Sequence, residues 1–143
     1  MWQKEQVTYY AVIDTNVLIS AMLKEGSLPW KIIDLVESDT LVPLLNDEII
    51  NEYNEVSWRN EFGFDEGFIS KTIEMIVSKS ISLERLETDE TFVDKNDIVF
   101  YEIVLSARQT MDAYLVTGNI KHYPKKIFVV TPREMLKTIG VID

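Results

Sequence analysis

Three acidic residues of this 143-residue chain stand where apolar segments would hold them in place. Asp14 follows the apolar run of residues 10–13, Glu52 lies in an amphipathic stretch, and Asp97 opens a largely apolar one. Carboxylates that converge on one point repel each other, so they are stable only with raised pKa values or a bound cation. With no cysteine and a single histidine in the chain, oxygen ligands indicate a hard ion, Mg²⁺ or Mn²⁺. Such ions serve phosphodiester hydrolysis.

Each acid taken alone also has an ordinary explanation. Asp14 could cap a helix that begins near residue 16 by accepting a backbone N–H. Glu52 could be a solvated helix residue, and Glu48 and Glu55 are rival acids on the same stretch. Asp97 could be an acid that the positive end of a helix dipole favours. The metal hypothesis therefore depends on the three acids acting together.

A second polar group follows the apolar residues 113–116. Thr117 and Asn119 offer neutral oxygens that could bind a metal or orient a water, and Gly118 permits close approach of the backbone. An ordinary boundary between a strand and a turn would look the same. His122, the only histidine, could contact a phosphate, although a position in a surface loop is the plainer explanation.

The spacing of apolar residues predicts alternating strands and helices. Strands are expected over residues 10–13, 40–45, 80–84, 113–117 and 127–130. Helices are expected after residue 16, over about 29–38, from Asn46 or Asp47, over about 68–77, over 95–108, and from a capping box of Thr131 and Glu134. This alternation predicts an α/β fold with a parallel sheet covered by helices on both faces. In open sheets of that kind, ligands bind at the carboxyl ends of the strands, where Asp14 is expected.

Length and composition predict one domain over residues 1–143. No apolar run approaches the roughly 20 residues of a membrane span, and the polar start does not have the pattern of a secretion signal. We therefore expect a cytoplasmic protein that does not enter a membrane. The net charge of −10 argues against indiscriminate binding to nucleic acid, although residues 105–143 carry six basic and three acidic side chains.

Four segments together resemble the PIN domain family of nucleases. Residues 14–16 (DTN) after a first strand resemble its opening motif, and residues 52–56 (EYNEV) resemble its second acidic region, which selects Glu52 over its neighbours. Residues 94–97 and 113–119 resemble its third and fourth motifs, in the same order. The whole pattern is similar to PIN proteins that are toxin components of bacterial toxin–antitoxin pairs.

The resemblance implies a three-layer α/β/α fold and a metal-dependent endoribonuclease. It also implies Asp14, Glu52 and Asp97 as ligands of Mg²⁺ or Mn²⁺, RNA as the substrate, a homodimer and a small antitoxin partner. Many family members carry an aspartate where this chain has Asn119. That departure leaves three acids and leaves open whether a second metal is held, to which Asp94 or Asp112 could contribute.

We expect Asp14 and Asp97 to bind the metal directly, Glu52 to bind it directly or through water, and Thr117 and Asn119 to orient ligands or water. Phosphates are expected to meet the basic residues of the last quarter of the chain, namely Arg108, Lys121, Lys125 and Lys126. The alternative is a non-catalytic PIN-like module that binds RNA or a partner, and the negative net charge favours it because unassisted RNA binding would be weak. A phosphohydrolase with an aspartyl nucleophile would need an acid at position 16, which is asparagine, and a receiver domain would need an acid pair near the first strand.

Overall fold

The computed structural model describes residues 7–143, and residues 1–6, on which the prediction about a secretion signal depends, lie outside the described part. A sheet of five parallel strands runs through the molecule in the order β3-β2-β1-β4-β5. The strands are β1 (Tyr9–Ile13), β2 (Leu41–Leu45), β3 (Ile81–Ser82), β4 (Ala113–Val116) and β5 (Val129–Val130). The predicted parallel α/β sheet is confirmed.

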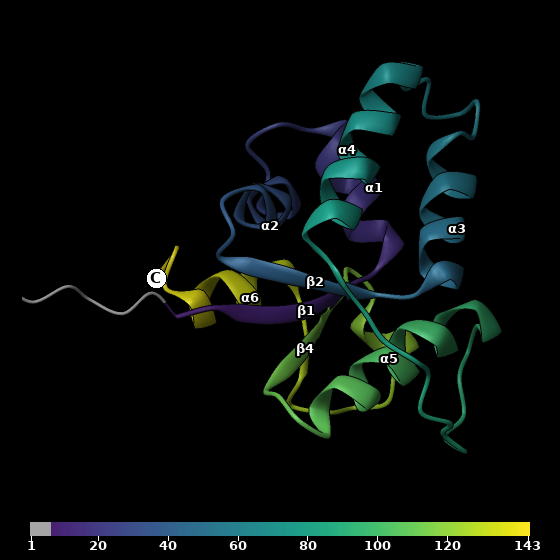
Figure 1. Cartoon of the computed structure of the whole chain (residues 1–143), viewed down its shortest axis with the longest axis vertical. Coiled ribbons are helices and arrows are strands. Elements are labelled where there is room, and N and C mark those ends of the chain that lie inside the picture. The colour runs from purple at the N-terminus through teal and green to yellow at the C-terminus, as the bar shows by residue number, and fades with distance from the viewer. Residues whose placement is uncertain (1–6) are drawn as a thin grey trace, which may run out of the picture.

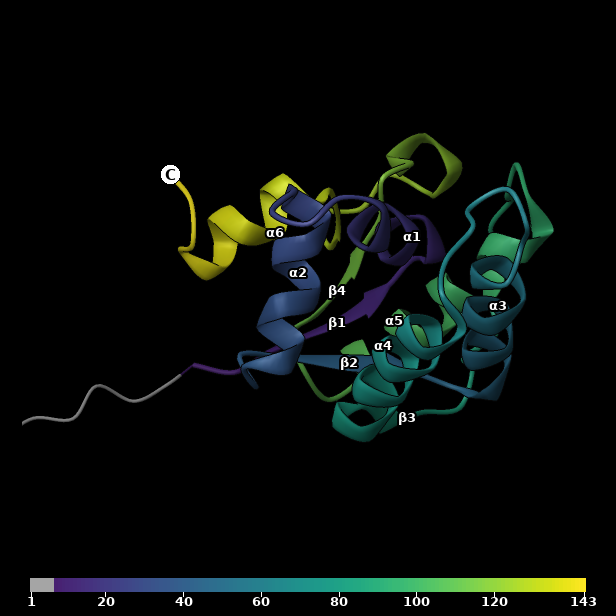
Figure 2. The same ribbon diagram turned by 90° about the horizontal axis from the view of Figure 1, so that it is seen from above.

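Helices cover both faces of this sheet. They are α1 (Thr15–Leu23), α2 (Leu28–Glu37), α3 (Asp47–Ser57), α4 (Glu66–Lys79), α5 (Ile98–Arg108) and α6 (Pro132–Ile139), with short 3₁₀ turns η1 (Lys95–Asp97) and η2 (Ile120–His122). Helix α5 packs against β1, β2 and β4 on one face, whereas α1, α2 and α4 lie over the other (Figure 1). Figure 2 shows the same arrangement from above. The structure therefore has the three layers that the family resemblance implies.

The central strand β1 determines where the site lies. Ala11, Val12 and Ile13 are all buried because helices cover both faces of the sheet. The strand is therefore continuously apolar and does not alternate between apolar and polar residues. Strand β4 pairs with β1 in parallel, and Ile13 lies opposite Val116. The Asp14 N–H donates to the Val116 carbonyl at 2.9 Å, so the chain leaves both strands at the same point. The residues that follow β1 and β4 are thus neighbours.

The helix starts follow the expected capping chemistry. Ser27 accepts a hydrogen bond from the Trp30 N–H, and Asn46, not Asp47, accepts from the N–H of Ile49. The capping box of Thr131 and Glu134 is formed at the start of α6, as predicted. These caps satisfy backbone donors that would otherwise lack partners in the first helical turns.

Two predicted strands are shorter than expected. The strand predicted over 80–84 is reduced to Ile81–Ser82, and the one over 127–130 to Val129–Val130. The Val129 N–H bonds to the Lys126 carbonyl at 3.1 Å, which closes a turn and leaves Ile127 in solvent. The helix predicted from residue 95 begins as η1 and becomes α-helical at Ile98. Within residues 7–143, every helix is too short or too polar to cross a bilayer.

Candidate active site

Asp14 is almost completely enclosed at the carboxyl end of β1, with 5% of its surface exposed. It occupies the N-cap position of α1 without a regular capping hydrogen bond, although the backbone N–H groups of Thr15 and Asn16 lie close enough to lower its pKa. Its Oδ2 accepts instead from Thr117 Oγ1 at 2.8 Å, from the Tyr123 hydroxyl at 3.0 Å and from Asn16 Nδ2 at 3.3 Å. All three donors are neutral groups.

The environment of Asp14 works against its negative charge. Burial raises the pKa of the carboxyl, and the hydrogen bonds from Thr117 and Tyr123 only partly oppose that rise. Within residues 7–143, no lysine, arginine or histidine pairs with Asp14. A buried carboxylate without a cationic partner lowers the stability of the fold, so a cation bound at this position would be stabilising.

Glu52 lies on α3, which is tied to the end of β1 because the Tyr53 hydroxyl donates to the Ile13 carbonyl at 2.5 Å. The Glu52 carboxylate accepts a hydrogen bond from the hydroxyl of Thr15, the residue next to Asp14. Burial raises the pKa of Glu52, and the charge of Asp14 raises it further. The rival acids behave differently. Glu48 is paired with Arg85 at 2.8 Å, and Glu55 is exposed on α3.

Asp97 closes the turn η1 just before α5. Its Oδ2 is buried without a hydrogen bond, although Nδ1 of His122 lies 3.4 Å away. Burial, followed by the charges of Asp14 and Asp94, raises the pKa of Asp97 to about 6, and His122 acts in the opposite direction. Buried carboxylate oxygens nearly always have partners. An unpartnered one beside other acids is suited to a cation.

The Tyr123 hydroxyl donates to Asp14 at 3.0 Å, and the charges of Glu52 and Asp97 also reach it. Burial raises the pKa of this phenol, and the charges of Asp14, Asp97 and Glu52 each raise it further. The donors are oxygens only, which suits Mg²⁺ or Mn²⁺. Among residues 7–143, however, no three acidic or histidine side chains are already gathered into a metal cage. The oxygen donors of Asp14, Glu52 and Asp97 fit a hard cation in their chemistry.

The polar residues that follow β4 are hydrogen-bonded to the residues at the start of α1. Thr117 is fully buried, donates to Asp14, and accepts from the backbone N–H of Asn119 at 3.0 Å. The Gly118 N–H donates to Asn16 Oδ1 at 2.9 Å, and a Cβ on Gly118 would come within 3.3 Å of that oxygen. The close backbone approach predicted for Gly118 is therefore present. Asn119 is exposed beside these groups, at the start of η2.

Several residues proposed from the sequence serve structural purposes. Arg108 donates to the Ala113 carbonyl at 2.7 Å, and its guanidinium lies 4.5 Å from the centre of the Phe128 ring. Lys126 pairs with Glu90 at 3.4 Å. These contacts argue against both residues as free phosphate ligands, whereas Lys121 and Lys125 are exposed.

The two spare acids are not placed alike. Asp112 precedes β4, so it lies at the opposite end of that strand from Thr117, and 81% of its side chain is exposed. Asp94 caps η1 by accepting the Asn96 N–H at 2.9 Å, and its charge reaches both Asp97 and Glu52. Asp112 therefore lies away from the site, and Asp94 lies at its edge.

Sequence reasoning missed the residues that hold the acids. Thr15 and Asn16 are part of the DTN motif, so their contacts with Glu52 and Asp14 could have been inferred from the motif. Tyr123 carries no such signal, since it lies 109 positions from Asp14 in the chain. His122 was expected in a surface loop, and the structure places it beside Asp97.

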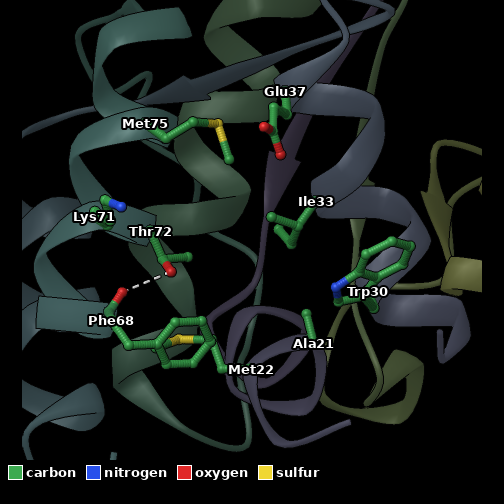
Figure 3. A pocket seen from close by; sticks show the side chains of 9 residues that line it. All are labelled: Ala21, Met22, Trp30, Ile33, Glu37, Phe68, Lys71, Thr72 and Met75. Carbon is green, nitrogen blue, oxygen red and sulfur yellow. Dashed lines mark hydrogen bonds between the residues drawn. The ribbon is translucent and has the colours of Figure 1, made fainter. Parts of the chain in front are cut away.

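The molecule also has a groove between α1, α2 and α4 with a volume of about 490 Å³ (Figure 3). Its lining includes Met22, Trp30, Ile33, Phe68 and Met75. Only one acid lines it, so it cannot gather carboxylates around a metal. A smaller hollow of about 330 Å³ contains the Glu52 carboxylate. The acids that suit a metal therefore lie at the carboxyl edge of the sheet and not in this groove.

Comparison with known proteins bears on the family and the fold. Residues 10–121 match the family model described as "PIN domain". The chain is 26% identical over 123 residues to the "Uncharacterized protein MJ1680" of Methanocaldococcus jannaschii, an alignment that covers 83% of this chain and 76% of that protein. The crystal structure of PAE2754 from Pyrobaculum aerophilum superposes with a TM-score of 0.57 at 15% identity, covering 96% of this chain and 94% of that one. At that identity the superposition bears on the fold alone.

Proposed function

Since this chain belongs to the PIN domain family, whose members are generally nucleases that use divalent metal ions, we propose that it is an endoribonuclease dependent on Mg²⁺ or Mn²⁺. The observation that carries the proposal is that the buried Asp14 has no basic partner in the described part of the chain, while its charge raises the pKa of both Glu52 and Asp97 nearby. Three neighbouring acids whose one basic neighbour among the described residues is His122, beside Asp97, form a site suited to a cation. An RNA phosphodiester is the substrate that such a cation would serve.

Asp14, Asp97 and Glu52 are the residues that would hold the ion. The buried Asp97 Oδ2, which makes no hydrogen bond, is the strongest support for that assignment. When bound, a divalent ion activates water as a nucleophile and offsets negative charge on the phosphate in the transition state. The acids supply the charge that binds it, and they are already partly desolvated, which strengthens their attraction for a cation.

The remaining side chains of the site orient these groups. Thr15 holds the Glu52 carboxylate, and Thr117 holds that of Asp14. We assign the exposed Asn119 to orienting a water or a phosphate oxygen at the end of β4. His122, beside Asp97, could offer a ring N–H to a phosphate oxygen of the RNA.

The wider context remains a proposal of the same kind. We propose one domain over residues 1–143 in a cytoplasmic protein that forms a homodimer and acts as the toxin of a toxin–antitoxin pair with a small antitoxin protein. Its support is the resemblance of the four motifs. A small gene adjacent to the coding gene, whose product binds this chain and blocks its activity, would establish the toxin role.

A non-catalytic module that binds RNA or a partner is the second candidate. The net charge of −10 favours it because repulsion of RNA phosphates would make unassisted RNA binding weak. The asparagine at position 119 favours it because the site then lacks a fourth carboxylate for a metal. The two candidates differ in one observable, namely whether RNA is cut.

The test is cleavage of a panel of structured RNAs by the purified protein with Mg²⁺ or Mn²⁺. We expect at least one RNA to be cut, and Asp14→Asn or Asp97→Asn to lower the rate by about 10³-fold, since each removes a metal ligand. Asp112→Asn is the matched control and should keep the rate within about twofold, because this acid lies at the other end of β4. Acid variants that cut as fast as the parent would show that the activity belongs to a contaminant. A parent that binds RNA without cutting would favour the second candidate.

A further inference from the structure

Tyr123 joins the two halves of the candidate site. It follows the turn η2, where its N–H bonds to the Ile120 carbonyl at 3.1 Å, and the next residue is Pro124. Only 6% of Tyr123 is exposed, so its ring is part of the core while its hydroxyl reaches Asp14 at 3.0 Å. Core packing therefore holds the ring of Tyr123, and the hydrogen bond to Asp14 holds its hydroxyl.

The hydrogen bonds of Asp14 are unevenly distributed between its two oxygens. Thr117, Tyr123 and Asn16 all donate to Oδ2, whereas no side-chain donor in residues 7–143 reaches Oδ1. A carboxylate has about four acceptor positions shared between its two oxygens. Three side-chain donors fill the capacity of Oδ2, and the backbone N–H groups of Thr15 and Asn16 also act on the carboxyl. The Tyr123 hydroxyl is thus one of the groups that fix how this carboxylate is turned.

The ring of Tyr123 is held by the segment that carries Asp97. Phe92 packs its edge against Tyr123, with 6.1 Å between ring centres, and against Tyr101 at 5.3 Å. Tyr101 in turn donates its hydroxyl to Glu90. Residues 90–92 lead directly into η1, which ends at Asp97. One aromatic side chain therefore contacts both the loop that leads to Asp97 and the oxygen of Asp14.

We infer that Tyr123 is a positioning residue of the acidic site, because its hydroxyl holds Oδ2 of Asp14 and so fixes the orientation of the carboxylate that would bind the cation. This inference rests on the proposed function. The competing explanation is that a buried tyrosine satisfies its hydroxyl with the nearest acceptor and has no effect on ligand binding. The two explanations predict different results when the hydroxyl alone is removed.

The structure supplies a matched control for that experiment. Tyr123→Phe keeps the ring, its packing on Phe92 and the buried surface, and removes one hydroxyl that donates to a carboxylate. Tyr101→Phe removes the same group from another buried tyrosine that donates to a carboxylate, Glu90, and whose hydroxyl bonds to none of the three acids. A general loss of stability would affect both variants, whereas a positioning role belongs to Tyr123 alone.

The experiment measures binding of Mn²⁺ alone to the full chain by isothermal titration calorimetry, with circular dichroism to establish that each variant is folded. Tyr123→Phe should weaken Mn²⁺ binding by about tenfold or more, as is typical for loss of a group that orients a metal ligand. Tyr101→Phe should change it less than twofold. In cleavage assays, Tyr123→Phe should lower kcat at saturating RNA and leave KM for RNA close to that of the parent.

Three results would overturn the inference. Mn²⁺ binding of Tyr123→Phe within twofold of the parent would show that the hydroxyl does not position Asp14, with the nuclease proposal intact. Equal losses in Tyr123→Phe and Tyr101→Phe would show a purely structural effect. A parent chain that binds no Mn²⁺ and cuts no RNA would overturn the proposed function, and this inference with it.

Discussion

Asp14 and Glu102 are equally buried carboxylates, each 5% exposed, with opposite surroundings. Glu102, on α5, lies 2.7 Å from the Arg85 guanidinium and accepts the Thr88 N–H at 2.8 Å. Asp14 has only neutral donors, and the acids Glu52 and Asp97 lie close enough to act on the same hydroxyl. Burial alone therefore does not distinguish a structural acid from a functional one.

The difference lies in what compensates each charge. Arg85 bridges Glu102 on α5 and Glu48 on α3, so the paired acid fixes the loop before η1 to two helices. No basic residue in the described part of the chain pairs with Asp14, and neutral hydrogen-bond donors offset its burial only in part. A protein that retains such an acid carries a destabilising charge, which is a common feature of functional sites. The paired acid stabilises the fold, and the unpaired one is available to a ligand.

The largest expected effect comes from breaking the compensated pair. Glu102→Gln removes the charge that Arg85 faces and should lower the free energy of unfolding by about 3 kcal/mol, the lower end for a buried pair because Arg85 is partly exposed. Urea unfolding at pH 7 measures this. Glu48→Gln, which removes the exposed partner of the same arginine, is the control and should cost less than about 1 kcal/mol. Equal losses would mean that burial of Glu102 does not matter.

The opposite sign is expected at the uncompensated acid. Asp14→Asn removes a buried charge while its amide oxygen can still accept from Thr117 and Tyr123, so the metal-free protein should gain about 2 kcal/mol of stability. For a chain of this length that gain corresponds to a rise in Tm of about 6 °C. Thermal unfolding in a chelator tests it. A large fall in Tm would instead mean that Asp14 is a structural residue and would remove the contrast with Glu102.

A bound cation should compensate Asp14 as Arg85 compensates Glu102. Mn²⁺ at ten times its dissociation constant should stabilise the folded chain by about 1.4 kcal/mol, through binding to the native state alone. Thermal scans with and without Mn²⁺ measure the shift. Asp97→Asn should reduce the shift, and Asp112→Asn should leave it unchanged. A shift of the same size in all three proteins would place the Mn²⁺ site elsewhere on the surface.

The fold could be read from the sequence because its signals are local. The apolar run before Asp14 and the capping box at Thr131 depend on residues near each other in the chain, and both are present in the structure. The short strands β3 and β5 were overestimated, because their lengths depend on pairing with distant strands and on a turn that forms at Lys126.

The contacts within the site could not be predicted in the same way. Tyr123 reaches Asp14 only because β4 pairs with β1 in one register, which no spacing in the sequence reveals. His122 approaches Asp97 for a similar reason. Arg108 had the correct charge for a phosphate contact, but the Ala113 carbonyl and the Phe128 ring engage it. The residue types limit the chemistry, and long-range pairing decides which residues take part.

The smallest expected effect is a pH dependence that belongs to the uncompensated acids alone. The pKa of Asp97 is raised from 3.8 to about 6, so the metal-free folded chain binds a proton that the unfolded chain releases between these values. Stability therefore falls as pH rises through that window, the reverse of an acid paired with a cation. Near pH 4, Asp97→Asn and the parent should have the same free energy of unfolding. At pH 7 the free energy of unfolding of Asp97→Asn should be higher by about 1 kcal/mol. This figure is kept small because Asp97 is partly exposed. Urea unfolding in a chelator at a series of pH values measures the difference between the two proteins. A difference that stays constant with pH would mean that Asp97 titrates normally, and the contrast with Glu102 would then depend on Asp14 alone.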